Sequence, residues 1–102
     1  MVYIGNISIT FENVSNFQTV EVTCGNEQRL LSSGKSTAFQ ISESTCGKVK
    51  VYNGDSLIRE VGFNIGTNPT TQVWNIHNDG VKGNISGHLV GSQDYPWSYV
   101  NR

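Results

Sequence analysis

The sequence has few of the residues that build helices. Its 102 residues include one alanine and four leucines, and these two residue types have the strongest helix propensity. Valine, isoleucine, threonine and tyrosine dominate instead, together with asparagine, serine and glycine. That profile is typical of strands joined by turns. The composition therefore predicts an all-β protein with almost no helix.

Charge is also scarce. Charged residues make up 15% of the chain and the formal net charge is -1, whereas soluble domains usually contain about 25% charged residues. The basic residues are scattered and form no stripe that would neutralise phosphates, so we expect no nucleic-acid partner. No apolar run approaches the roughly 20 residues that cross a bilayer, so we expect no membrane span. Residues 1–6 do not begin a signal peptide, which leaves a cytoplasmic protein and one with a removed signal both open.

Cysteine is limited to Cys24 and Cys46. The two residues permit one disulfide, worth on the order of 3 kcal/mol in the loop-entropy model. Asn-x-Ser sequons at Asn6, Asn13 and Asn84 favour a secreted or cell-surface location. The alternative is a cytosolic protein with two free thiols and unmodified asparagines.

Apolar residues recur at every second position along most of the chain, which is the period of a half-buried strand. Eight such segments are separated by turn residues at intervals of about ten residues, which favours a sandwich over an open sheet. We predict a single domain over residues 1–102, an antiparallel two-sheet β-sandwich of jelly-roll-like type with about eight strands. The predicted strands cover residues 3–11, 17–24, 27–31, 36–42, 48–52 and 56–63 and the two arms of a hairpin within 71–89.

Two dipeptides fix the expected hairpins. Asn53-Gly54 and Asp79-Gly80 are favoured where a tight turn needs positive φ. After the first turn, Leu57 is expected to face inward and Arg59 to lie on the surface. Pro96 demotes the last segment to an edge strand or a docked tail.

The sequence predicts no enzyme. His77 and His88 are the only imidazole bases, and they lie too far apart along the two arms of one hairpin to be cross-strand neighbours. Asp55, Asp79 and Asp94 fall in or beside turns, where Asp is expected for capping turn amides. A calcium site built from these carboxylates and backbone carbonyls stays an alternative, since calcium needs only oxygen ligands. No other cofactor or metal is expected.

Binding fits the residue inventory better than catalysis. Saccharides are held by Asp and Asn side chains and glycine amides, with an aromatic face against the apolar side of the sugar ring. Two polar turns supply the first kind of group, and the C-terminal aromatic residues supply the second. The predicted ligand-binding residues are Asn53, Asp55, Asn78, Asp79, Gly80, Tyr95 and Trp97. Plain hairpin chemistry for the turns and burial for Trp97 stay open as alternatives.

These features resemble those of small jelly-roll lectins and haemagglutinins, such as the short slime-mould lectins. The resemblance implies that loops at one end of the sandwich bind glycans or glycoproteins. It also implies help from calcium and an oligomer that multiplies weak sites. In legume-type lectins an Asp, a Gly amide, an Asn and an aromatic residue form the sugar site. Here those parts would fall to Asp79, Gly80, Asn78 and Trp97.

A second resemblance implies a protein-binding module. Residues 68–74, Asn-Pro-Thr-Thr-Gln-Val-Trp, are similar to a loop of chagasin-type inhibitors of cysteine proteases, and Tyr95-Pro96-Trp97 is similar to their later Arg-Pro-Trp segment. Those inhibitors are immunoglobulin-like sandwiches that insert loops into the protease cleft. Gln72 stands where the family has glycine, and Tyr95 where it has arginine. Protease inhibition is the alternative to sugar binding.

Overall fold

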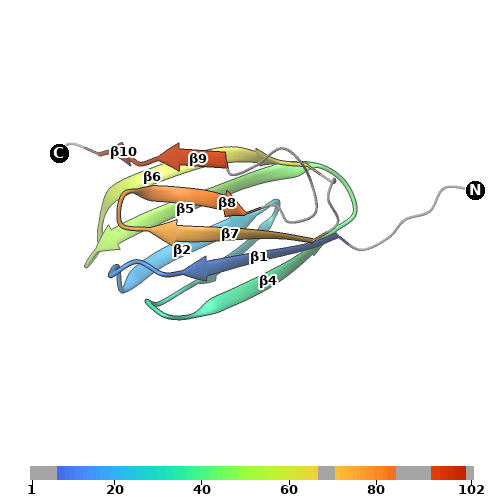
Figure 1. The fold of residues 1–102 in the computed structure, drawn as a ribbon. Coiled ribbons are helices and arrows are strands. Elements are labelled where there is room, and N and C mark those ends of the chain that lie inside the picture. Colours follow the sequence, from blue (N-terminus) through green and yellow to red (C-terminus); the bar gives the residue numbers. More distant parts are fainter. Residues whose placement is uncertain (1–6, 67–70, 85–92, 101–102) are drawn as a thin grey trace, which may run out of the picture.

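Two β-sheets packed face to face make up the fold (Figure 1). The structure, a computed structural model, describes residues 7–66, 71–84 and 93–100. These residues form ten strands and contain no helix. The predicted all-β sandwich is confirmed. Within the described residues no helix is long and apolar enough to cross a membrane.

Each sheet contains five strands. Sheet A contains, in spatial order, β4 (Ser36–Ile41), β1 (Ile7–Asn13), β7 (Thr71–His77), β8 (Gly80–Asn84) and β9 (Gln93–Pro96). Sheet B contains, in spatial order, β10 (Ser98–Tyr99), β6 (Ser56–Ile65), β5 (Thr45–Asn53), β2 (Thr19–Cys24) and β3 (Glu27–Leu30). The predicted strands correspond to β1–β8, and the last segment divides into the edge strands β9 and β10, as Pro96 predicted.

One strand pair departs from the predicted antiparallel arrangement. β1 and β7 lie side by side in sheet A and are parallel, with Ile9 opposite Gln72 and Phe11 opposite Trp74. Both strands run toward the same end of the sandwich in Figure 1. The strands between them in the sequence belong mostly to sheet B. The chain leaves β1 at one end of the sandwich and begins β7 at the other end, where β1 also began. Period-two alternation carries no information on such long connections.

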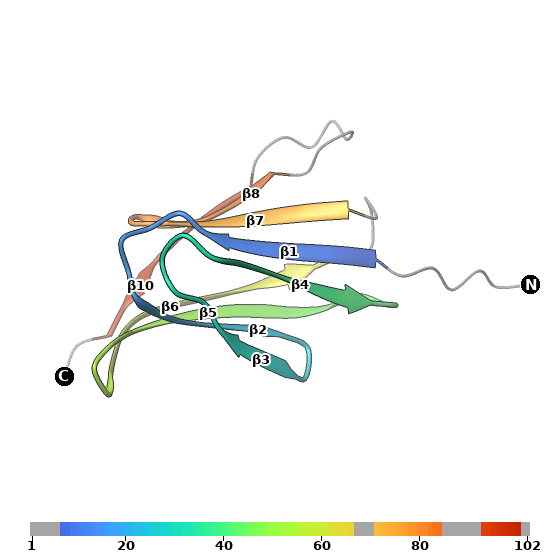
Figure 2. The ribbon, with the colours of Figure 1, turned by 90° about the horizontal axis from the view of Figure 1, so that it is seen from below.

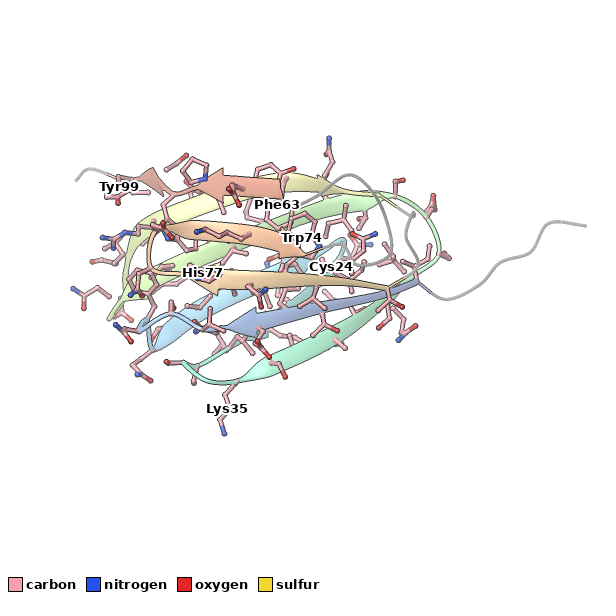
Figure 3. All side chains as sticks on the ribbon, viewed as in Figure 1. Cys24, Lys35, Phe63, Trp74, His77 and Tyr99 are labelled. Carbon is pink, nitrogen blue, oxygen red and sulfur yellow. The ribbon has the colours of Figure 1, made fainter. Side chains whose placement is uncertain are left out.

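Figure 2 shows the two sheets as separate layers, seen from below. The core is built from the inward residues of the alternating strands. Phe63 stacks on Trp74 with ring centroids 4.5 Å apart, and on Tyr95 at 5.0 Å; Figure 3 labels Phe63 and Trp74. A Cβ added at Gly83 would lie 2.5 Å from the Trp74 ring, so glycine is what leaves room for the indole. The largest fully buried side chains are Ile9, Phe11, Val20, Val22, Phe39, Val49, Val51, Ile65, Gln72, Trp74, Ile76 and Val81.

A β-bulge corrects the predicted phase of β6. Val51 pairs with Arg59, but Tyr52 pairs with Leu57, so Ile58 is the extra residue. A bulge shifts the alternation by one position. Ile58 therefore packs against the core in the place predicted for Leu57. Arg59 is not a free surface residue either, because its guanidinium lies over two aromatic rings.

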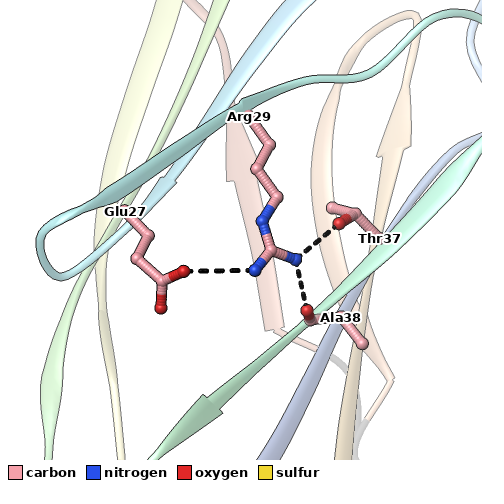
Figure 4. Close-up of polar contacts among 4 residues, drawn as sticks. All are labelled: Glu27, Arg29, Thr37 and Ala38. Atoms are coloured by element: carbon pink, nitrogen blue, oxygen red, sulfur yellow. Dashed lines mark hydrogen bonds and ion pairs between the residues drawn. The ribbon is translucent and has the colours of Figure 1, made fainter.

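Arg29 closes one side of the sandwich, where β3 of sheet B approaches β4 of sheet A (Figure 4). Its guanidinium donates hydrogen bonds to Thr37 Oγ1, at 2.8 Å, and to the Ala38 carbonyl oxygen. It also pairs with Glu27 Oε1 at 3.1 Å and lies 4.1 Å from the centre of the Phe39 ring. Through these contacts the Arg29 side chain covers the two edge strands β3 and β4. A charged side chain over a sheet edge is one way in which proteins prevent pairing with the edge of another sheet.

Trp97 closes the opposite side, where the chain passes from β9 in sheet A to β10 in sheet B. Its side chain is 6% exposed. The indole Nε1 donates a hydrogen bond to the His77 carbonyl oxygen at 3.2 Å, and the ring meets Phe17 edge to face at 6.1 Å. Trp97 thus lies between the last residue of β9, Pro96, in sheet A and the first residue of β10, Ser98, in sheet B.

The predicted disulfide is wrong, because Cys24 and Cys46 face opposite sides of sheet B. Cys24 lies opposite Gly47 in the β2–β5 pair, so the neighbouring residue, Cys46, points to the other face. Both thiols are free, with Cys24 buried and Cys46 exposed. Burial raises the pKa of the Cys24 thiol, and the nearby carboxylate of Glu27 adds to this shift.

We expect one thiol per folded chain to react with a thiol reagent such as DTNB, and two in denaturant. Cys46 is exposed, whereas Cys24 is both buried and held in its unreactive protonated form by its raised pKa. The variant Cys46→Ser should abolish the reaction of the folded chain and leave only the Cys24 thiol, which reacts in denaturant. Two unreactive sulfurs in denaturant without reductant would instead show a disulfide.

Candidate functional site

Both predicted polar turns lie at the same end of the sandwich. The β5–β6 turn (residues 54–55) comes from sheet B and the β7–β8 turn (residues 78–79) from sheet A, and Figures 1 and 2 show both at the end where β1 also leaves its sheet. The connection between β1 and β2 (residues 14–18) lies there as well. Three connections from two sheets therefore surround one end of the fold.

A buried asparagine holds the β1–β2 connection in place. β1 continues to Asn13, a residue that the sequence placed in a polar loop. Asn13 is 0% exposed, and its Nδ2 donates hydrogen bonds to the carbonyl oxygens of Leu31, at 2.9 Å, and Phe17, at 3.1 Å. Its Oδ1 accepts hydrogen bonds from the backbone N–H and the hydroxyl of Ser15. The first half of the connection is therefore fixed by side-chain hydrogen bonds.

The same burial bears on the predicted sequons. A glycan could not be attached to Asn13 in the folded protein, because the side-chain amide is enclosed and fully hydrogen-bonded. Asn6 and the side chain of Asn84 lie outside the described residues.

A pocket of about 280 Å³, here called the end pocket, opens between the β1–β2 connection and the β5–β6 turn. None of its lining residues is charged. Three carry amide side chains, and two carry aromatic rings that come from different strands or connections. The lining residues are Asn16, Phe17, Gln18, Thr19, Tyr52, Asn53, Gly54 and Ile58.

This combination suits a neutral, polyhydroxylated ligand. Amide groups both donate and accept hydrogen bonds, as sugar hydroxyls do, and an aromatic ring packs against the apolar side of a sugar. The volume lies near the lower limit of about 300 Å³ for ligand pockets, which fits one or two sugar residues better than a larger ligand. The pocket therefore meets the chemical requirements that the sequence analysis assigned to the turns.

Of the seven predicted site residues, Asn53 lines the end pocket, whereas Asp55 from the same turn does not. Asn53 is the last residue of β5, pairs with Ser56 and lines the pocket. Gly54 follows with φ of 64°, the conformation that the Asn-Gly dipeptide predicted. Asp55 is exposed in the same turn.

Asn78 and Asp79, in the second turn, have other contacts. Asn78 Oδ1 accepts a hydrogen bond of 2.8 Å from the backbone N–H of Asn16, so this side chain braces the β1–β2 connection. Asp79 Oδ2 lies 3.8 Å from Nζ of Lys82. Asp79 and Lys82 line a second pocket of about 240 Å³, together with Gly80, Val81, Asp94, Tyr95 and Pro96.

The remaining predicted residues serve packing. A Cβ at Gly80 would lie 2.5 Å from the carbonyl oxygen of Tyr95, so the turn needs glycine to let β8 and β9 approach. Tyr95 is half-buried in the stack on Phe63. The ring of Trp97 is buried between the sheets and offers no open face to a sugar. The aromatic platform predicted from Tyr95 and Trp97 is therefore not available at the surface.

The carboxylates and histidines form no metal site among the residues that the structure describes. Asp79 and Asp94 line one pocket with the ammonium group of Lys82, while Asp55 belongs to the other turn. Asp55 therefore lies apart from Asp79 and Asp94, and the three carboxylates do not form the calcium site that the sequence left open. His77 uses its backbone carbonyl to bind Trp97, and His88 lies outside the described residues.

Sequence reasoning missed Asn16, Phe17, Gln18 and Tyr52. The first three belong to a segment assigned to a polar connection and the start of a strand. The available signal was Phe17 itself, since an aromatic residue directly after Ser15-Asn16 is unusual for a solvated loop. Tyr52 could not be identified in advance, because its partner across the pocket comes from a different strand connection.

A larger hollow of about 640 Å³ lies over the outer face of sheet B. Lys48 and Lys50 rise beside it from alternate positions of β5, and Gly62 leaves its floor without a side chain. Its one aromatic residue, Phe63, belongs to the core. This is the pattern of a solvated sheet face, so we place the candidate site at the end pocket.

The two segments that resemble those of chagasin-type inhibitors are described in part. Residues 68–70 lie outside the described residues, and Thr71–Trp74 begins β7, with Trp74 buried. β7 begins at the end opposite the polar turns, whereas Pro96 ends β9 near them (Figure 1). Comparisons with protein families, with curated proteins and with solved structures found no match to this chain.

Proposed function

We propose that this protein binds glycans through the end pocket. The observation that carries the proposal is an uncharged pocket in which three amide side chains and two aromatic rings from separate connections face one space. A buried hydrogen bond of Asn13 and an exposed one of Asn78 hold the β1–β2 connection beside it. A rigid polar pocket loses little conformational entropy on binding.

The shape and size of the pocket also indicate how such a protein would act. A shallow site for one or two sugars binds weakly, and several copies presented together raise the avidity without new contacts. An oligomer or a multivalent glycan surface is therefore part of the proposal. Catalysis is not, since no residue that lines the pocket is an acid or an imidazole base.

A glycan array followed by calorimetric titration of the best ligand tests the proposal. The double variant Asn16→Ala with Gln18→Ala removes two pocket amides whose side chains are exposed. We expect about thirtyfold weaker binding, from about 1 kcal/mol for each of two hydrogen bonds lost, and an unchanged Tm.

The control variant, Asn26→Ala with Gln28→Ala, removes the same chemistry from exposed positions that do not line the end pocket. It should bind as the unmodified protein does. Equal losses in both variants would place the site elsewhere. A chain that binds no glycan but inhibits a papain-like protease would overturn the proposal in favour of a protein-binding module.

A further inference from the structure

The guanidinium of Arg59 lies beside the end pocket and is held by two aromatic rings. Its central carbon is 5.1 Å from the centre of the Phe17 ring and 4.8 Å from that of the Tyr99 ring. The Nε atom is buried and has no hydrogen-bond acceptor. Such donors are few in folded proteins and each needs an explanation. Among the described residues the other one is the Nε1 of Trp74, which is enclosed in the core, whereas Arg59 lies at the end of the sandwich.

Arg29 shows what a purely structural arginine looks like in the same fold. Both arginines lie over aromatic rings where the two sheets meet, but Arg29 also binds Thr37, the Ala38 carbonyl and Glu27 (Figure 4). Among the residues that the structure describes, the Arg59 guanidinium forms no hydrogen bond or ion pair. The two aromatic rings account for the position of the Arg59 guanidinium, but they provide no acceptor for its N–H groups.

The acidic residues near Arg59 in the sequence do not neutralise it. Glu60 is the next residue of β6, so it projects from the opposite face of the strand, in the row of Lys50 and Ser98. Asp55 is exposed in the β5–β6 turn. A guanidinium stacked on rings presents its donors around its own edge, the geometry that binds a carboxylate through two parallel hydrogen bonds.

Two residues connect this arginine to the end pocket. The Phe17 ring lines the pocket and carries the Arg59 guanidinium, and Ile58, the bulge residue, lines the pocket next to Arg59 in the chain. A ligand in the pocket therefore has a cation at its side, across one aromatic ring. Arg59 faces inward because it pairs with the buried Val51 and alternates in phase with Val61, and the bulge residue Ile58 lies next to it at the pocket.

We infer that the glycan bound by this protein is acidic, with a sugar carboxylate on Arg59 and the neutral part of the sugar in the end pocket. The inference rests on the proposed function and adds the substrate class, a sialic or uronic acid. Phe17 and Tyr99 act as positioning residues that hold the guanidinium in its plane. The pocket supplies the hydroxyl contacts, and Arg59 supplies the selection for charge.

Binding of 3′-sialyllactose, its methyl ester, lactose, and matched glucuronic acid and glucose disaccharides tests the inference by calorimetry. We expect the intact protein to bind at least one free acid about tenfold to a hundredfold more tightly than its neutral counterpart, as charge-assisted hydrogen bonds predict. The comparison of 3′-sialyllactose with its methyl ester uses the unmodified protein. It therefore tests the inference even if a substitution unfolds the chain.

Three variants locate the effect. Arg59→Gln should bring the ratio of acid to neutral sugar affinity close to one, and this ratio is the readout because the Arg59 side chain also packs on the pocket residue Phe17. Arg59→Lys should recover only part of the preference, because it keeps the charge and loses the planar fork. Lys50→Gln removes a charge from the outer face of sheet B and should change nothing. Equal binding of acid and neutral sugars would overturn the inference and leave the proposed function standing, whereas no binding of any sugar would overturn both.

Discussion

Replacing Trp97 by alanine is expected to destabilise the protein by about 3 to 5 kcal/mol, the range for truncating a buried tryptophan. The side chain is 6% exposed, packs on Phe17 and donates to the His77 carbonyl. It also lies where β9 of one sheet continues into β10 of the other. Its loss therefore opens a cavity, orphans a carbonyl group and loosens the only link between those edge strands. For a domain of this size, such a change approaches the whole free energy of folding.

Chemical denaturation monitored by far-ultraviolet circular dichroism measures the effect. Tyr99→Ala is the matched control, because it truncates a ring two residues away that is 65% exposed. We expect that control to lose less than about 1 kcal/mol, as surface substitutions usually do. A Trp97→Ala variant as stable as the control would mean that the indole does not close the sandwich.

Local alternation predicted the elements of this fold, because strand formation depends on neighbours in the sequence. Val20, Val22 and Cys24 were predicted to share one face, and all three are buried. Asn53-Gly54 and Asp79-Gly80 mark real hairpins, since positive φ is a property of the turn residue itself.

Long-range features were not predictable in the same way. The parallel pairing of β1 with β7 depends on which end of the sandwich each connection reaches. The bulge at Ile58 is set by the fit between β5 and β6, and it reverses the orientation expected for Leu57. Trp97 was a candidate ligand platform because tryptophan suits both exposed and buried roles, and only the two sheet edges beside it decide between them.

The candidate site follows the same division. Asn53 was found because the turn chemistry that predicts a hairpin also presents a polar side chain. Asn16, Phe17 and Tyr52 share a pocket with it only because two connections from different parts of the chain meet at one end. The orphan guanidinium of Arg59 required coordinates, since nothing in the sequence distinguishes it from Arg29, which has its full set of partners.

Replacing Asn13 by alanine is expected to cost about 3 to 5 kcal/mol and to disrupt the end pocket. The change would leave the carbonyl oxygens of Leu31 and Phe17 and the N–H of Ser15 buried without partners. Each such group costs about 1 to 3 kcal/mol, and the three belong to one network, so their sum is an upper limit. Because Phe17 lines the pocket, binding should weaken together with stability.

Two further variants separate the network from simple loss of volume. Asn13→Asp keeps the shape and one acceptor, but it turns an acceptor toward the two carbonyls that Nδ2 serves. It should therefore be at least as unstable as Asn13→Ala at neutral pH. Asn16→Ala removes an exposed amide from the same connection and should leave the denaturation midpoint within experimental error. If Asn13→Asp unfolds at the same denaturant concentration as the unmodified protein, the hydrogen bonds to Phe17 and Leu31 do not hold the connection, and the rigidity assigned to the end pocket is wrong.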